Sequence, residues 1–242
     1  MRASPKAAQS PALLQMDTAI AQADELYGRR IEPGAVRESV TLLTESRDNE
    51  ELYEVQWRLA RSLFFLGQEA ESSRERLEWH RAGAGAGGRA RQLVASRVEG
   101  HFWAGVNLAL YAEAAGGVKA ARALLDARRD LMRAIGISES YHGAGPLRVR
   151  GRLEHKAPWF LGGGRKKGRD YLERAHGIAP TNSVTLIYLA ELALEMGEPD
   201  RAVKALKEAI AAEIDPAWEF ENRRDKKLAR EMLNRLGSSR DR

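Results

Sequence analysis

The 242-residue chain contains no cysteine. This absence excludes disulfides, thiolate zinc sites and cysteine nucleophiles, so side-chain packing alone has to hold the fold together. No apolar run approaches the ~20 residues of a membrane-spanning helix, and residues 1–17 lack the apolar core of a secretory signal. We therefore expect no transmembrane segment in this chain. Its compartment stays open: periplasmic if a signal has been removed, and otherwise cytoplasmic.

A strong excess of either charge is also missing. Charged residues make up 30% of the chain, but the formal net charge is only +5 and the sequence pI is about 9.5. An excess this small does not indicate nucleic-acid binding, although it suits an anionic ligand or a membrane surface. The hydrophobic content of 43% is enough for a substantial core.

Catalytic and cofactor motifs are absent as well. The spacing of Gly83, Gly85 and Gly88 matches the dinucleotide pattern G-x-G-x-x-G, but the preceding residues have helical rather than strand character. A flexible break or a close glycine contact between two helical pieces explains this run better. The Gly162–Gly164 run lacks the Gly-Lys-Ser/Thr ending of a phosphate loop, and no two histidines have metal-ligand spacing. We therefore expect no enzymatic activity, cofactor or metal.

What the sequence does contain is helical periodicity almost throughout. Apolar residues recur at intervals of three, four and seven from Leu13 to Gly28, and similar stripes follow to Leu236. Asp48 or Asn49 is a suitable N-cap for the third helix. The pattern predicts an all-α protein of about ten or eleven helices in antiparallel pairs. We expect one helical-repeat domain over residues 13–237, between flexible tails at residues 1–12 and 238–242.

Two helical hairpins near the C-terminus share a repeat frame. Aligning Gly197 with the interhelical glycine of a tetratricopeptide repeat starts one unit at Ser183. Small residues at fixed positions of the second helix then let the two helices of a unit approach each other closely. A large residue between them fills the groove against the next pair of helices. The small, large and small positions are Ala202, Leu206 and Ala209 in this unit, and Gly168, Leu172 and Ala175 in the preceding one. Weaker matches begin near Trp103 and Trp57.

Several short motifs make the resemblance more specific. They are W-x-x-x-x-N-L at Trp103–Leu108, G-P-L-R-x-x-G at Gly145–Gly151, K-A-P at Lys156–Pro158, G-G-x-x-K-G-x-x-Y-L-E-x-A at Gly163–Ala175 and P-x-W-x-x-E at Pro216–Glu221. With them the chain resembles the T component of tripartite ATP-independent periplasmic transporters. More distantly, through W-R-L-A-R at Trp57–Arg61, it is similar to the regulator of microtubule dynamics family. These resemblances imply an all-helical tetratricopeptide superhelix with a central cavity or concave groove. They also imply a role as a transporter accessory, or in lipid binding and tethering.

The segment from Gly145 to Pro180 concentrates positive charge. Between Leu147 and Arg174 only three residues are acidic, whereas nine are basic: Arg148, Arg150, Arg152, Lys156, Arg165, Lys166, Lys167, Arg169 and Arg174. They lie close in sequence to a helix that begins after three glycines, and its free backbone N–H groups favour an anion. Together these features predict an anion-binding site. The alternative is that they form ion pairs with neighbouring helices or cover a solvated face. The sequence leaves both interpretations open.

Aromatic and polar side chains supply further candidates for the wall of a site. Trp103, Asn107 and Tyr111 follow one another at four-residue steps along a helix, a spacing that also suits a core. Trp159 and Phe160 lie in a loop, where they either cover the cavity or pack beneath the loop. The predicted ligand-binding residues are Trp103, Asn107, Tyr111, Arg148, Arg152, Lys156, Trp159, Gly163 and Gly164.

These residues predict a non-enzymatic binding protein. Its expected partner is a small anionic or amphipathic ligand, such as an organic acid or a lipid, held in a groove or cavity. The alternative is an interaction scaffold that docks a peptide segment of a protein partner, such as a transporter component, on its concave face.

Overall fold

The computed structural model describes residues 11–45 and 52–240, and within them the chain is all-helical, as predicted. Short 3₁₀ turns at Trp159–Leu161 (η2) and Pro216–Trp218 (η3) separate some of the helices. The α-helices are α1 (Pro11–Gly28), α2 (Ala35–Glu45), α3 (Tyr53–Glu69), α4 (Ser73–Leu93), α5 (Val98–Ala114), α6 (Gly117–Ile137), α7 (Tyr141–Lys156), α8 (Arg165–Ile178), α9 (Ser183–Glu195), α10 (Pro199–Ala211) and α11 (Glu219–Arg240).

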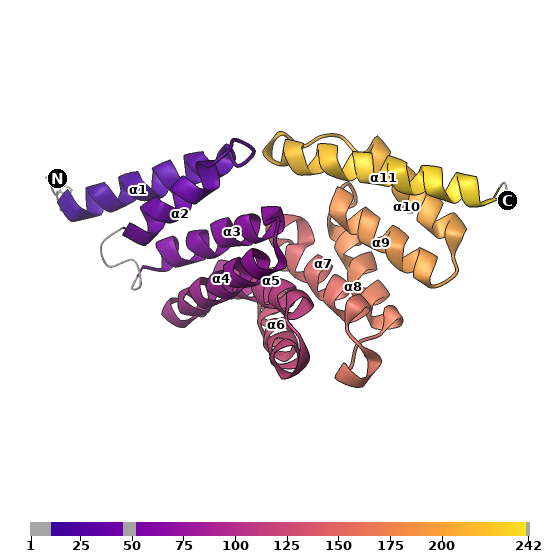
Figure 1. The fold of residues 1–242 in the computed structure, drawn as a ribbon, viewed down its shortest axis with the longest axis horizontal. Coiled ribbons are helices and arrows are strands. Elements are labelled where there is room, and N and C mark those ends of the chain that lie inside the picture. Colours follow the sequence, from indigo (N-terminus) through magenta and orange to yellow (C-terminus); the bar gives the residue numbers. More distant parts are fainter. Residues whose placement is uncertain (1–10, 46–51, 241–242) are drawn as a thin grey trace, which may run out of the picture.

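The helices form an arc with two layers. Each helix packs against the next along the chain, and the odd-numbered helices α1, α3, α5, α7, α9 and α11 also contact one another in series. The odd-numbered helices therefore make the inner layer, and the even-numbered ones lie outside it. Figure 1 shows the arc, with the first and last helices spread across one side and α6 on the opposite side.

The repeat positions identified from sequence are buried as expected. Leu172 and Ala175 of α8, and Ala202, Leu206 and Ala209 of α10, are completely inaccessible to solvent. Glycine is needed where α7 and α8 cross, because a Cβ on Gly168 would lie 3.0 Å from the Gly151 carbonyl oxygen. Small residues thus set the distance between paired helices, and large ones fill the groove.

The glycine-rich run lies inside α4, which is a single continuous helix. The expected flexible break at this position is therefore wrong, and the element before α4 is the helix α3, not the strand that a dinucleotide site requires. The alternative of a close contact is right. A Cβ on Gly83 would lie 2.5 Å from the Asn107 Oδ1 atom, and one on Gly87 would lie 2.5 Å from the Ala104 backbone nitrogen.

Some expected boundaries differ from the observed ones. The proposed caps Asp48 and Asn49 lie outside the described residues, and α3 begins after Leu52. Of the expected tails, residues 1–10 and 241–242 are outside the described part, whereas α1 already begins at Pro11 and α11 continues to Arg240. Within residues 11–45 and 52–240, no helix combines the length and apolar character needed to cross a membrane.

A contact between the two ends of the fold closes the arc. Arg30, just after α1, donates from Nε to the Glu221 Oε1 atom at 2.7 Å and from a terminal nitrogen to Oε2 at 2.6 Å. A third hydrogen bond from Arg30 reaches the Ala217 carbonyl oxygen at 3.0 Å, and the guanidinium also lies over the Trp218 ring. In Figure 1, the turn after α1 meets the start of α11 at the top of the arc. The inner layer is consequently joined into a ring.

Candidate functional site

A cavity of about 740 Å³ occupies the inside of this ring. Its wall is built from the inner helices, with contributions from α6 and the turns around η2 and η3. Most of the side chains facing it are apolar or aromatic. They include Phe64, Phe102, Trp103, Val106, Leu110, Leu124, Val149, Leu153, Leu161, Tyr188 and Trp218. A volume of this size is typical of small-molecule sites, and the wall combines these apolar side chains with polar and charged ones such as Glu113, Arg148 and Glu221.

The start of α7 gives one side of the cavity an unusual backbone. His142, Gly143 and Ala144 have φ values of 54°, 60° and 58°, so three successive residues are left-handed. For His142 and Ala144 this conformation costs about 1–2 kcal/mol per residue. The right-handed part of α7 begins after them, close to Pro146 as expected. Such strain has to be held in place by the surrounding structure.

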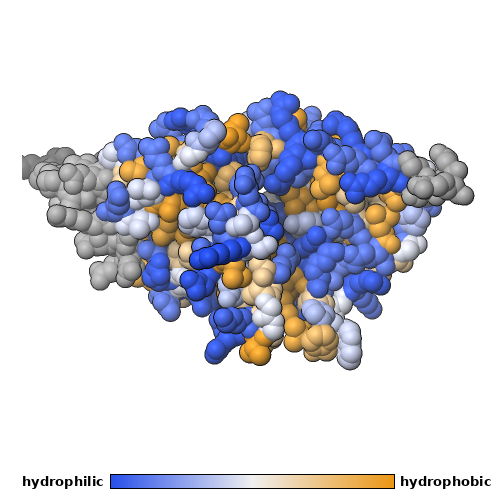
Figure 2. Space-filling model, in the orientation of Figure 1, coloured by the Kyte–Doolittle hydropathy of each residue, from blue (hydrophilic) through white to orange (hydrophobic). Residues whose placement is uncertain are grey.

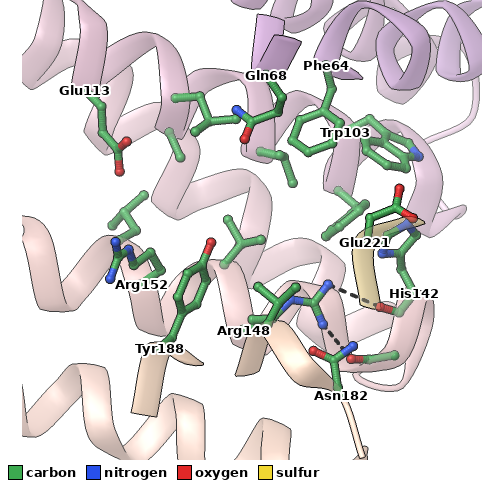
Figure 3. A pocket seen from close by; sticks show the side chains of 18 of the residues that line it. Phe64, Gln68, Trp103, Glu113, His142, Arg148, Arg152, Asn182, Tyr188 and Glu221 are labelled. Atoms are coloured by element: carbon green, nitrogen blue, oxygen red, sulfur yellow. Dashed lines mark hydrogen bonds between the residues drawn. The ribbon is translucent and has the colours of Figure 1, made fainter. Parts of the chain in front are cut away.

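Arg148 holds this left-handed turn from inside the wall. Its guanidinium donates to the Gly143 carbonyl oxygen at 2.7 Å and approaches the His142 carbonyl oxygen at 3.4 Å (Figure 3). Arg148 is buried, and among the described residues no carboxylate lies within ion-pair distance of it. Burial, which removes water from the guanidinium, lowers its pKa. The cavity wall therefore contains a buried positive charge that donates its hydrogen bonds to backbone carbonyls and has no carboxylate in direct contact among the described residues.

Aromatic rings enclose His142 beside this charge. Its ring centroid lies 4.5 Å from that of Trp218, 5.2 Å from Trp103 and 5.3 Å from Phe102. Burial lowers the pKa of His142 to about 3, with a further contribution from the Arg148 charge, so the imidazole is neutral at physiological pH. Burial also raises the pKa of Tyr141, to about 12. This part of the wall is thus mainly aromatic, and its charged groups are Arg148 and the Glu221 carboxylate, which pairs with Arg30.

Polar groups also face the cavity at a distance from His142. In Figure 3, Glu113, Arg152 and Tyr188 lie on the left side of the cavity, and aliphatic side chains lie between Glu113 and Arg148. The Arg152 guanidinium lies 4.5 Å from the centre of the Tyr188 ring and forms an ion pair with Glu191. Glu113 faces the cavity, and desolvation by the surrounding protein raises the pKa of its carboxyl group. The positive charges of Arg152 and Lys156 oppose this shift.

The structure brings four of the nine predicted site residues to the cavity wall and leaves five elsewhere. Trp103, Arg148, Arg152 and Lys156 line the cavity. Asn107 does not, because its amide is buried and donates to the carbonyl oxygens of Ala60 and Trp103 while contacting His80. Four-residue spacing alone does not tell a cavity wall from a core contact. The other residues that lie away from the cavity wall are Tyr111, Trp159, Gly163 and Gly164.

The loop between α7 and α8 does not cover the cavity. Trp159 and Phe160 are strongly exposed on the outside, which contradicts both the expected lid and the expected packing beneath the loop. The amide of Gly163 donates to the Pro158 carbonyl oxygen at 3.1 Å, and that of Gly164 to the Glu154 carbonyl oxygen at 2.8 Å. These amides shape the loop and are not presented to an anion.

Most of the basic cluster forms ion pairs. Six of its nine side chains pair with carboxylates, while Arg148 and Lys167 bind backbone carbonyl oxygens. The pairs are Arg150–Glu154, Arg152–Glu191, Lys156–Glu195, Arg165–Glu195, Arg169–Glu198 and Arg174–Glu139. The geometry thus favours the ion-pair interpretation for the cluster as a whole, with Arg148 as the exception that faces the cavity.

Histidines take structural positions in the described part of the chain. His155 contacts the Glu195 carboxylate at 2.8 Å, and His101 contacts the Ala95 carbonyl oxygen at 3.1 Å. In residues 11–45 and 52–240, no group of three or more histidine and acidic side chains is arranged to hold a metal ion.

Sequence reasoning missed several residues of the wall. His142 and Tyr188 had no distinguishing pattern, and the left-handed turn could not be predicted from a histidine and an alanine. Trp218 and Glu221 did carry a signal, because both belong to the P-x-W-x-x-E motif. That motif was noted only as a resemblance, and its contact with Arg30 depends on an approach between distant helices.

Comparisons with known proteins fit this architecture. Residues 166–219, from α8 to the start of α11, match the family model for the tetratricopeptide repeat. The chain is similar to the crystal structure of a thermophilic tetratricopeptide-repeat protein from Thermus thermophilus, with a TM-score of 0.66 and 19% identity over 88% of this chain and 97% of that chain. The chain has a tetratricopeptide-like helical-repeat fold.

Two MamA structures show the same tetratricopeptide-like arrangement at lower similarity. A MamA mutant has a TM-score of 0.51 and 15% identity, covering 84% of this chain and 97% of its own. MamA MSR-1 C2 has a TM-score of 0.51 and 17% identity, covering 81% and 93%. A comparison with curated proteins found no match.

Proposed function

We propose that this helical-repeat protein is a non-enzymatic binding protein whose central cavity holds an amphipathic carboxylate. The observation that carries the proposal is Arg148, a buried cation without a carboxylate partner in the wall of an apolar cavity. A buried charge is costly unless it is paired, and guanidinium groups bind carboxylates in a bidentate manner. A bound carboxylate would supply the missing partner.

The rest of the wall supports an apolar body for this guest. Val106, Leu110 and Leu124 provide an aliphatic surface, and Phe64 and Trp103 add aromatic area. The other cations of the wall are already paired, Arg152 with Glu191, Lys156 with Glu195 and Arg224 with Asp225. Charge recognition in the cavity consequently depends on Arg148. A transporter-accessory or lipid-handling role, as the motif resemblances imply, would be consistent with such a guest.

Calorimetric titration with laurate, using dodecanol as the uncharged match, tests the proposal. Laurate should bind more tightly than dodecanol, and Arg148→Met should remove that difference. Because Arg148 also holds the left-handed turn, Tyr188→Phe provides a milder change in the same wall, which should alter laurate affinity while the fold is retained. Equal affinity of the wild-type protein for laurate and dodecanol would contradict a carboxylate site.

The alternative is a scaffold that binds a peptide segment of a protein partner. It is favoured by the tetratricopeptide match over α8–α10 and by the similarity to repeat proteins of the same fold. In that case the purified protein should retain no small molecule in native mass spectrometry and should not bind laurate.

A further inference from the structure

The outer surface carries a concentration of exposed apolar side chains on α6 and the loop before α8. Ten large apolar side chains are exposed among the described residues, and five of them belong to α6 and the loop before α8. We call these five the outer patch: Val118, Leu125, Met132, Trp159 and Phe160. The exposed fractions of Trp159 and Phe160 are 84% and 69%, and those of the three α6 residues range from 45% to 86%. Seven-residue spacing places Val118, Leu125 and Met132 along one stripe of the helix.

A side chain of α6 joins the two parts of the outer patch. Arg128 follows Leu125 by three residues and precedes Met132 by four, so it lies on the same face of the helix. Its guanidinium donates to the Leu161 carbonyl oxygen and forms an ion pair with Glu154 at 2.7 Å. In the view of Figure 2, apolar atoms gather at the lower margin, where Figure 1 places α6 and the loop between α7 and α8.

The loop presents its aromatic rings on a fixed backbone. The amide of Leu161 donates to the Pro158 carbonyl oxygen at 3.0 Å, and that of Gly162 to the Trp159 carbonyl oxygen at 2.9 Å. Gly162 has a φ of 79°, a left-handed value that glycine adopts without strain. The two rings lean against each other edge to face, with centroids 6.0 Å apart. They form a projecting tip, not a groove.

Cations without an ion-pair partner lie on α6 and at the start of α8, the helix that follows this tip. In the described part of the chain, Lys119, Arg122, Arg133 and Lys166 have no ion-pair partner, in contrast to Arg129, Lys156 and Arg169, which pair with carboxylates. The helix α6 carries five basic residues and two acidic ones, and residues 159–169 carry four basic residues and none that is acidic. The outer patch therefore combines protruding aromatic rings with a strong local positive charge.

We propose that the outer patch binds the surface of an anionic phospholipid bilayer. Tryptophan and phenylalanine side chains insert at the boundary between headgroups and acyl chains, and arginine and lysine side chains beside them attract anionic headgroups. A projecting tip suits a deformable bilayer, whereas a protein partner would have to supply a matching pocket. The positive charges of the four unpaired cations complement the negative charges of anionic lipid headgroups.

Vesicle flotation tests this proposal on the full chain. The protein should float with vesicles that contain phosphatidylglycerol and phosphatidylcholine, but not with phosphatidylcholine alone. Raising the salt concentration from about 0.05 M to about 0.5 M should release it, because salt screens the headgroup attraction. Failure to bind the anionic vesicles at low salt would overturn the proposal.

Two pairs of variants locate the contact. Trp159→Ala/Phe160→Ala and Arg122→Glu/Lys166→Glu should each weaken vesicle binding at least about tenfold. The matched controls, Ile31→Ala/Ile214→Ala and Lys207→Glu/Lys227→Glu, change exposed residues outside the patch and should bind as the wild type does. All four changes concern exposed side chains, and circular dichroism checks that each variant is folded. Equal loss in a control pair would place the contact elsewhere.

The Trp159→Ala/Phe160→Ala variant also distinguishes a membrane from a second copy of the chain as the partner of the outer patch. If sedimentation velocity showed self-association that Trp159→Ala/Phe160→Ala abolished, while no vesicle binding occurred, the outer patch would be a contact between copies. That result would overturn the bilayer assignment.

Discussion

Arg30 and Glu221 lie 191 positions apart in the sequence and form a two-pronged ion pair, with N–O distances of 2.7 and 2.6 Å. Both side chains are largely shielded from solvent, and Glu221 also lines the cavity. An open repeat arc has no such contact between its ends. This pair therefore joins the two ends of the arc beside the cavity.

Replacing Arg30 by methionine should open the ring. The change leaves Glu221 partly buried without its partner, so the free energy of unfolding should fall by about 1–3 kcal/mol in urea titrations. The radius of gyration from small-angle scattering should rise. The matched control is Arg223→Met, which removes an exposed pair with Glu219 and should change stability by no more than about 0.5 kcal/mol. Equal effects of the two substitutions would show that the closing contact has no special role.

Two adjacent glycines of α4 should respond in opposite directions to the same substitution. A Cβ on Gly87 would lie 2.5 Å from the Ala104 backbone nitrogen, whereas one on Gly88 meets nothing within 4 Å. Gly87→Ala should therefore lower the free energy of unfolding by about 1–3 kcal/mol. Gly88→Ala should raise it by up to about 1 kcal/mol, because alanine loses less backbone entropy in a helix. Chemical denaturation measures both, and a shared sign would contradict the close approach of α4 and α5.

Glu195 should remain ionised at unusually low pH. The Lys156 ammonium, at 2.6 Å, and the His155 ring lower its pKa from 4.5 to about 2. Because the folded-state pKa is lowered, this contact stabilises the fold above about pH 4.5, and the contribution is lost as the pH falls toward 2. Carboxyl titration by NMR should give a midpoint near 2.

Two variants that each replace one lysine by methionine serve as the test and the control for this titration. Lys156→Met should move the Glu195 midpoint toward 4.5, and Lys207→Met on α10 should leave it unchanged. A wild-type midpoint already near 4.5 would show that the ion pair does not form in solution.

Helix positions and repeat frame followed from local patterns. Apolar spacing and the small residues at Ala202 and Ala209 depend on neighbours within one hairpin, so the sequence predicted them well. The continuity of α4 was harder to predict, because glycine disfavours a helix locally while the contact of Gly87 with Ala104 favours it. In α4, the packing of Gly87 against α5 therefore outweighs the low helix propensity of glycine.

The cavity depends on contacts that no local pattern specifies. Arg148 and Lys156 belonged to the same basic cluster in sequence, yet one faces the cavity with only carbonyl partners and the other pairs with Glu195 on α9. Trp159 was expected at the cavity, and the direction of its loop places it outside. The orientation of a loop and the choice of an ion-pair partner are both set by helices distant in the sequence.

Filling the cavity with a larger side chain tests whether it is a binding site. Ala109 lines the cavity on α5, whereas Ala114, at the end of the same helix, is exposed and lies away from it. Laurate binding should be measured by calorimetry on Ala109→Phe and Ala114→Phe. We expect Ala109→Phe to abolish binding and Ala114→Phe to retain the wild-type affinity. Wild-type affinity in a folded Ala109→Phe protein would show that the guest binds elsewhere and would contradict the account.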